Sequence, residues 1–180
     1  MNSLKSIIFV FSFLFVNTIN GQDFCFGEEH FKSVLYLNNS VVVQDKLIQT
    51  FSHLQRRKKD PVSYTIATEF ELIPIYFFHY MLEDGDVTVD KRLILNQDLY
   101  QQEYSARVVE NDILPRSETL LDAKVTLVLS PLIENFLVAE FLETEANIGP
   151  YKSGRALQVL FIFDEQKDIQ KVLYASPLYN

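Results

Sequence analysis

The stretch Arg155-Ala-Leu-Gln-Val-Leu-Phe-Ile-Phe163 decides the fold, because it is largely apolar on both faces of an extended chain. Side chains of a β-strand point alternately to the two faces of its sheet. One face of this stretch carries Leu157, Val159, Phe161 and Phe163, and the other carries Ala156, Gln158, Leu160 and Ile162. A strand of this kind must be covered on both sides, which predicts a central position in a sheet.

Four further β-rich runs lie on either side of this strand in the sequence. They are residues 104–109, 120–129, 135–142 and 169–175, and turn residues such as Ser130-Pro131 and Gly149-Pro150 separate them. The C-terminal half of the chain therefore predicts an antiparallel meander.

The N-terminal half has helical periodicity instead. Apolar residues recur at helical spacing over residues 41–57, and Ser40 is expected to be the N-cap of this helix. A further helix is predicted to start at Thr88 and to present Val89, Leu93, Leu95 and Leu99 on its apolar face.

Two shorter elements are expected between these helices. Pro61 suits the first turn of a short helix that ends near Phe70. Residues 72–78 then form an apolar run that predicts a buried strand, at an edge or a bulge because it contains Pro74.

Helices followed by a meander are typical of an α+β domain. We expect the helices to pack on one face of a curved antiparallel sheet. The residues expected in one common core are Leu47, Phe51, Leu93, Leu127, Phe141 and Phe161.

Residues 1–21 have the order of a secretory signal peptide. Lys5 precedes an apolar run, residues 7–16, and polar residues follow before Gly21. The run is shorter than the roughly 20 residues that a membrane-spanning helix needs. We therefore expect cleavage after Gly21 and a secreted, extracellular protein without a membrane anchor.

The mature chain is expected to consist of an N-terminal extension, residues 22–39, and a single domain, residues 40–180. Hydrophobic residues make up 48% of the chain, which is enough to build a core. The net charge of −8 becomes −9 when Lys5, the only charged residue of the signal peptide, is removed. Such an acidic balance disfavours nucleic acid, because binding it depends on Lys and Arg that neutralise phosphates.

Two residues near the start of the mature chain are candidates for modification. Cys25 is the only cysteine, so a disulfide within the chain is impossible. It either pairs with another chain, in a homodimer or with a protein partner, or is a small buried hydrophobe between two phenylalanines. Asn38-Asn39-Ser40 is a glycosylation sequon, and Asn38 is expected to carry a glycan in an exposed loop just before a helix.

The order of these elements resembles the nuclear transport factor 2-like superfamily, in particular its small secreted domains. The resemblance rests on the N-terminal helix, on Lys59-Asp60 followed by Phe70, on Asp86-Val-Thr-Val-Asp-Lys91 opening a helix, and on the meander. It covers about residues 40–176. It implies a cystatin-like fold, in which helices wrap a strongly curved, cone-like sheet around a pocket. Some members use this pocket for ketosteroid isomerisation or dehydration, and others use it to bind or to dimerise.

No catalytic or cofactor motif is present in the sequence, and neither a cofactor nor a metal is expected. Tyr76, His79 and Tyr80 are the candidate ligand pocket, where a polar cluster would lie among aromatic side chains. The alternative for this run is a plain aromatic core strand. Gln158 and Glu140 either line a cavity or, as polar and charged side chains usually do, face solvent.

Two classes of function are compatible with this sequence. The first is a secreted, non-enzymatic module that binds a small apolar ligand or a protein partner, and the lack of a catalytic motif favours it. The second is a small isomerase-like or dehydratase-like enzyme with a cone pocket around His79. An apolar cavity in which a histidine and a carboxylate converge would favour the enzyme.

Overall fold

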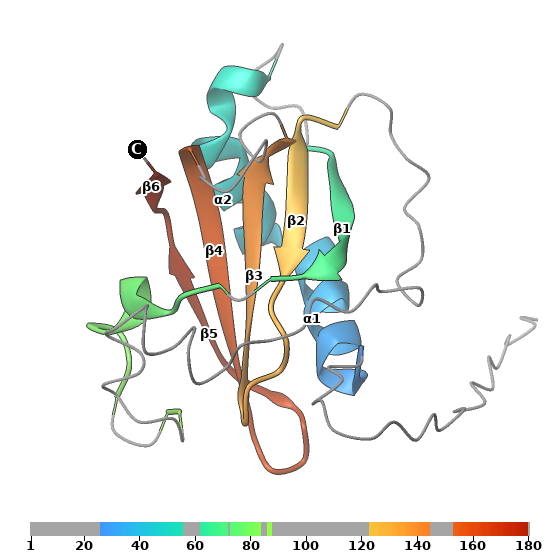
Figure 1. Ribbon diagram of the computed structural model, residues 1–180, viewed down its shortest axis with the longest axis vertical. Coiled ribbons are helices and arrows are strands. Elements are labelled where there is room, and N and C mark those ends of the chain that lie inside the picture. The colour runs from blue at the N-terminus through green and yellow to red at the C-terminus, as the bar shows by residue number, and fades with distance from the viewer. Residues whose placement is uncertain are drawn as a thin grey trace, which may run out of the picture.

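The computed structural model describes residues 26–55, 62–71, 73–83, 86–87, 123–144 and 153–179. Within these ranges the chain has an α+β fold, as expected (Figure 1). The helical elements are α1 (Glu28–Asn39), α2 (Val41–Thr50) and the 3₁₀ turns η1 (Ser52–Leu54) and η2 (Tyr76–Phe78). The strands are β1 (Tyr64–Phe70), β2 (Val125–Leu129), β3 (Phe136–Glu143), β4 (Gly154–Phe163), β5 (Ile169–Ala175) and β6 (Leu178–Tyr179).

Ser40 joins the two α-helices and caps the second one. Its backbone N–H donates to the carbonyl of Tyr36 at the end of α1. Its hydroxyl oxygen accepts a hydrogen bond from the N–H of Val43 at 3.4 Å, which satisfies a donor that the first turn of a helix leaves free. The predicted N-cap is therefore confirmed, although α2 is shorter than expected and ends at Thr50.

The sheet has the strand order β1-β2-β3-β4-β5, and β6 pairs with β4 in a separate ladder. Strands β2 to β5 each pair antiparallel with their neighbour in sequence, which confirms the predicted meander for this part of the chain. β4 lies between β3 and β5, and its residues 156–163 are all buried. The expected interior position of this strand is confirmed.

β1 differs from the prediction. Residues 64–70 form a strand and not the end of a short helix, and this strand pairs parallel with β2. The sheet is therefore mixed and not antiparallel throughout. Tyr64, Thr65 and Ile66 favour an extended chain, and β2 offers them an edge to pair with, so sheet pairing outweighs the helix-start signal of Pro61.

The chain after β1 runs across the face of the sheet opposite to the helices (Figure 1). This crossing segment, residues 73–83, contains η2 instead of the predicted strand. Pro74 has no N–H to donate to a ladder, whereas Ile73, Ile75 and Phe78 are buried as anchors. The prediction that this run is buried is therefore confirmed at Ile73, Ile75 and Phe78, whereas the prediction that it forms a strand is wrong.

Two apolar layers cover the sheet. The helix-side core lies between the α-helices and the sheet, and the second core lies on the opposite face, together with the crossing segment. Successive residues of a strand alternate between these layers. In β3, for example, Leu137 and Phe141 belong to the helix-side core, and Val138 and Leu142 belong to the second core.

The predicted core is confirmed where it can be followed. The residues that share the helix-side core as predicted are Leu47, Phe51, Leu127, Phe141 and Phe161. Val34 and Leu37 of α1 belong to the same core, although residues 22–39 were expected to be an extension. Leu93, the helix predicted from Thr88 and the strand predicted over residues 104–109 lie outside the described residues, as do the signal peptide and Cys25.

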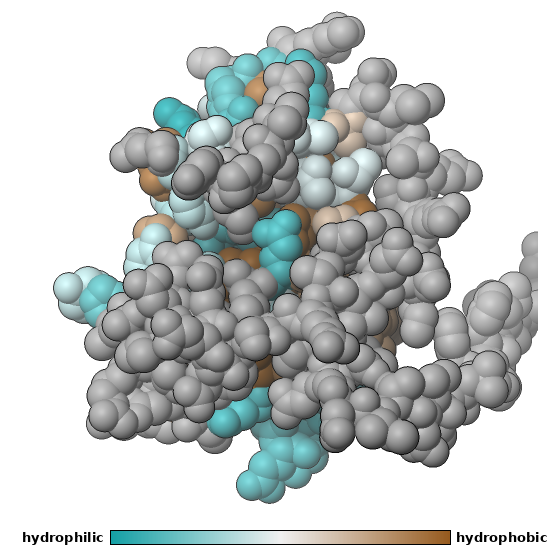
Figure 2. All heavy atoms as spheres, in the orientation of Figure 1, coloured by the Kyte–Doolittle hydropathy of each residue, from teal (hydrophilic) through white to brown (hydrophobic). Residues whose placement is uncertain are grey.

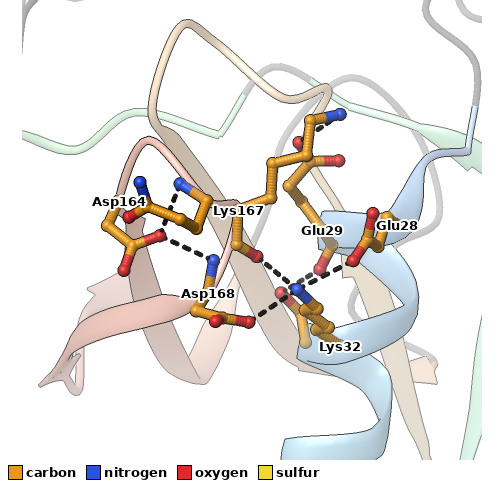
Figure 3. Close-up of polar contacts among 8 residues, drawn as sticks. Glu28, Glu29, Lys32, Asp164, Lys167 and Asp168 are labelled. Atoms are coloured by element: carbon orange, nitrogen blue, oxygen red, sulfur yellow. Dashed lines mark hydrogen bonds and ion pairs between the residues drawn. The ribbon is translucent and has the colours of Figure 1, made fainter.

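A network of charged side chains fixes the start of α1 to the turn between β4 and β5 (Figure 3). Lys32 Nζ donates to Asp168 Oδ1 at 2.7 Å and to the Lys167 carbonyl at 2.8 Å, and it lies 2.8 Å from Glu28 Oε1. Lys167 Nζ in turn lies 3.2 Å from the buried carboxylate of Glu29. The hydrogen bonds to Asp168 and Glu28 raise the pKa of Lys32, so this contact keeps its positive charge.

We expect Phe161→Ala to lower the free energy of unfolding by about 3–5 kcal/mol, because this ring is fully buried and its loss leaves a cavity. The ring also packs edge-on against Tyr36, with ring centroids 5.6 Å apart. Phe31→Ala is the control, since Phe31 is 58% exposed and its loss should cost about 0.5 kcal/mol or less. Urea unfolding of the three proteins measures both values, and equal losses would contradict the core assignment.

Candidate functional site

Three polar side chains from β3, β4 and β6 meet in the second core. Glu140 and Gln158 are cross-strand partners in the ladder between β3 and β4. Gln158 Nε2 donates to Glu140 Oε1 at 2.8 Å and to the hydroxyl oxygen of Tyr179 at 3.0 Å. The Tyr179 hydroxyl donates to the same Glu140 oxygen. We call Glu140, Gln158 and Tyr179 the polar centre.

The polar centre lies on the face of the sheet that is opposite to the helices. Glu140 lies between Val138 and Leu142 on this face of β3, and Gln158 lies between Ala156 and Leu160 on the same face of β4. Figure 2 views the molecule from this side, where both hydrophilic and hydrophobic side chains of the described residues are visible.

Glu140 and Gln158 are both fully buried, so the expectation that they face solvent is wrong. The reason is the covering of the sheet on both faces, which leaves the middle of β3 and β4 no solvent-facing side. Burying a carboxylate and an amide is costly unless their polar atoms are hydrogen-bonded. The contacts within the polar centre offset this cost for Glu140 Oε1 and Gln158 Nε2.

One acceptor of the polar centre has no partner within the part of the chain that the structure describes. Gln158 Oε1 is buried and receives no hydrogen bond from these residues. A buried acceptor left in this state destabilises a fold by about 1–3 kcal/mol. Turning the amide over would place its oxygen against the carboxylate of Glu140 in place of its donor, so the network itself fixes the orientation.

Two tyrosine hydroxyls near Glu140 are held in their protonated form. Burial raises the pKa of Tyr179, and the charge of Glu140 raises it further. The same two causes, in the same order, raise the pKa of Tyr76 in the crossing segment. Phe77 connects the two tyrosines, with its ring 3.9 Å from that of Tyr76 and 6.3 Å from that of Tyr179 between centroids. The crossing segment therefore adds aromatic side chains next to the polar centre.

The predicted pocket residues Tyr76, His79 and Tyr80 lie in or beside η2. Tyr76 lies close enough to Glu140 for its pKa to be affected, as described above. His79 is half-buried, and its Nδ1 donates to the carbonyl of Tyr76 at 2.7 Å, within its own turn. Tyr80 is 90% exposed, and its ring lies against that of His79. The polar centre itself is formed by other residues, although Gln158 and Glu140 were candidates for a cavity.

Asn38 is exposed, as its predicted glycosylation requires, but it lies in the last turn of α1 and not in a loop. The hydroxyl of Tyr64 donates to Asn38 Oδ1 at 2.6 Å. A glycan would attach to the other atom of the amide group, the nitrogen. The exposed position and the sequon are therefore compatible with a glycan, whereas the predicted loop is wrong.

His30 is a buried titratable group that the sequence analysis missed. Its Nδ1 accepts a hydrogen bond from the N–H of Gly27 at 3.2 Å, and its Nε2 donates to the carbonyl of Ser130 at 3.1 Å. Its ring also contacts the rings of Phe26 and Phe70, with centroid distances of 5.3 and 4.8 Å. Burial lowers the pKa of His30 to about 4, and both ring nitrogens are used. The neutral form of the His30 ring therefore stabilises the folded protein.

Comparisons with known proteins leave the family open, because no protein-family model, curated protein or solved structure matches the chain significantly. Among the described residues, no helix has the length and apolar character needed to cross a membrane. The same part of the chain brings no three His, Cys, Asp or Glu side chains close enough to hold a metal ion.

The buried His30 predicts a loss of stability in acid. Its pKa is about 4 in the folded protein and 6.5 as the ordinary value, so the unfolded chain takes up the proton first as the pH falls. The contribution of His30 is intact above pH 6.5 and decreases by about 1.4 kcal/mol per pH unit between pH 6.5 and 4.

Urea unfolding at several pH values measures this dependence. His30→Gln should flatten the slope between pH 6.5 and 4 relative to the wild type. A slope that is the same in the wild type and in His30→Gln would show that His30 is not the group responsible.

Proposed function

We propose that the protein is an exported, non-enzymatic module that binds a small, mainly apolar molecule at the polar centre. Ligand sites are typically apolar and contain a few placed polar groups that orient the ligand. The second core has this composition, with Glu140, Gln158 and Tyr179 among aliphatic and aromatic side chains. The observation that carries the proposal is Gln158 Oε1, a buried acceptor to which no described residue donates a hydrogen bond.

The family resemblance and the cone-like curvature of the sheet remain part of this proposal. The resemblance implies a pocket between the helices and the sheet. That side is filled by the helix-side core, in which Phe51, Phe141 and Phe161 are fully buried. The proposed ligand site therefore lies on the opposite face, next to the crossing segment.

An enzyme of the isomerase or dehydratase type is the weaker alternative. It would need a group near the ligand that gains and loses a proton near the working pH. The raised pKa of Tyr179 keeps its hydroxyl protonated, so this group serves as a hydrogen-bond donor. His79 donates its Nδ1 hydrogen to Tyr76 within the crossing segment and has its ring against exposed Tyr80. These contacts favour binding over catalysis.

Titration with the apolar fluorophore N-phenyl-1-naphthylamine tests the binding function. We expect saturable binding, together with NMR shifts of the Gln158 side-chain amide and of backbone amides in β3 and β4 next to it. The exposed apolar side chains of α1, Phe31 and Leu35, serve as an internal control for non-specific binding. Shifts confined to α1 would contradict a ligand site at the polar centre.

Export predicts a defined N-terminus and a glycan. Protein secreted from a eukaryotic cell line should begin at Gln22 and should lose mass on enzymatic deglycosylation. Asn38→Gln should remove this mass difference, whereas the control Asn39→Gln preserves the sequon and should retain it. A product that stays inside the cell with residues 1–21 attached would argue against export.

A further inference from the structure

Gln158 Oε1 specifies the chemistry of the group that would occupy the polar centre. This oxygen is an acceptor, so its partner must donate a hydrogen atom. The Tyr179 hydroxyl, which accepts a hydrogen bond from Gln158 Nε2, donates its own hydrogen to Glu140 Oε1 and not to this oxygen. Since no donor of the described residues reaches this oxygen, a bound molecule that donates a hydrogen bond would satisfy it.

The surroundings of the acceptor select an uncharged donor. Glu140 accepts two hydrogen bonds as a carboxylate does, and its negative charge opposes an anionic group beside it. The neighbours on the same face of β3 and β4 are Val138, Leu142 and Leu160, which cannot hydrate a cation. Moving a cation into such a layer is unfavourable, because the Glu140 oxygen that faces the polar centre already accepts two hydrogen bonds from the fold.

We propose that the ligand carries an uncharged hydroxyl group on an apolar skeleton and that this hydroxyl donates to Gln158 Oε1. This inference rests on the binding function proposed above and adds the chemical class of the ligand. Gln158 is then the specificity-determining residue, because a ligand without a hydroxyl leaves its oxygen unpaired.

A matched pair of probes tests the inference, namely 2-naphthol and 2-methoxynaphthalene, which share a skeleton and differ in the hydroxyl hydrogen. The wild-type protein should bind 2-naphthol roughly 5- to 100-fold more tightly, which is the range expected when a buried acceptor gains its partner. Gln158→Leu should abolish this preference. The anion 2-naphthoate should bind more weakly than 2-naphthol, because it meets the charge of Glu140 and offers no hydrogen.

The outcomes separate the two proposals. Equal affinity for both neutral probes overturns the hydroxyl assignment and leaves the binding function in place, whereas binding of neither probe overturns the binding function. A preference for 2-naphthol that persists in Gln158→Leu overturns the role of Gln158.

If Gln158→Leu does not fold, a measurement on the wild-type protein tests the hydrogen bond between the ligand and Gln158 directly. A crystal structure with 2-naphthol should show its hydroxyl oxygen within hydrogen-bond distance of Gln158 Oε1. An ordered water that keeps this position in the presence of the probe overturns the inference, since the acceptor is then satisfied by solvent.

Discussion

The covering of the sheet on both faces is the constraint on which the rest of the structure depends. β3 and β4 have apolar side chains on each side, so each face needs a layer of its own. The helices supply one layer. The crossing segment contributes to the other with three buried anchors, Ile73, Ile75 and Phe78, although its only regular element is the short turn η2. Further along, Asp86 is fixed to Lys171 of β5 at 2.8 Å, which ties the chain after the crossing segment to the sheet edge.

The polar centre is the exception to this apolar arrangement, and it depends on the end of the chain. β6 consists of two residues, yet it brings the Tyr179 hydroxyl onto Glu140. The raised pKa of Tyr179 and the role of Glu140 as a hydrogen-bond acceptor support each other, because a protonated phenol is the donor that a buried carboxylate requires. β6 therefore supplies a hydrogen-bond donor to the buried carboxylate of Glu140, in addition to pairing with β4.

The sequence was sufficient to predict the meander and much less informative about the segments before it. Residues 155–163 have apolar side chains on both faces of an extended chain. This pattern predicts an interior strand, because both faces must be covered. For β1 the local signal of Tyr64, Thr65 and Ile66 competes with the helix-start signal of Pro61, and the parallel pairing with β2 that decides between them is far along the chain. The burial of Gln158 had a usable signal, namely Ala156 and Leu160 as its neighbours on one face. What the sequence lacks is the position of Tyr179, which only the pairing of β6 with β4 establishes.

The histidines show why sequence neighbours are a weak guide to chemistry. His79 stands among aromatic residues in sequence, but its hydrogen bond stays within its own turn. His30 has Glu29 and Phe31 as neighbours, yet it is buried because β1 brings Phe70 and the loop after β2 brings the Ser130 carbonyl. Both nitrogens of His30 are used by the fold, which makes it a structural residue. An unused polar atom in a buried position is a stronger indication of a ligand than a titratable side chain whose partners are complete, and Gln158 Oε1 is such an atom.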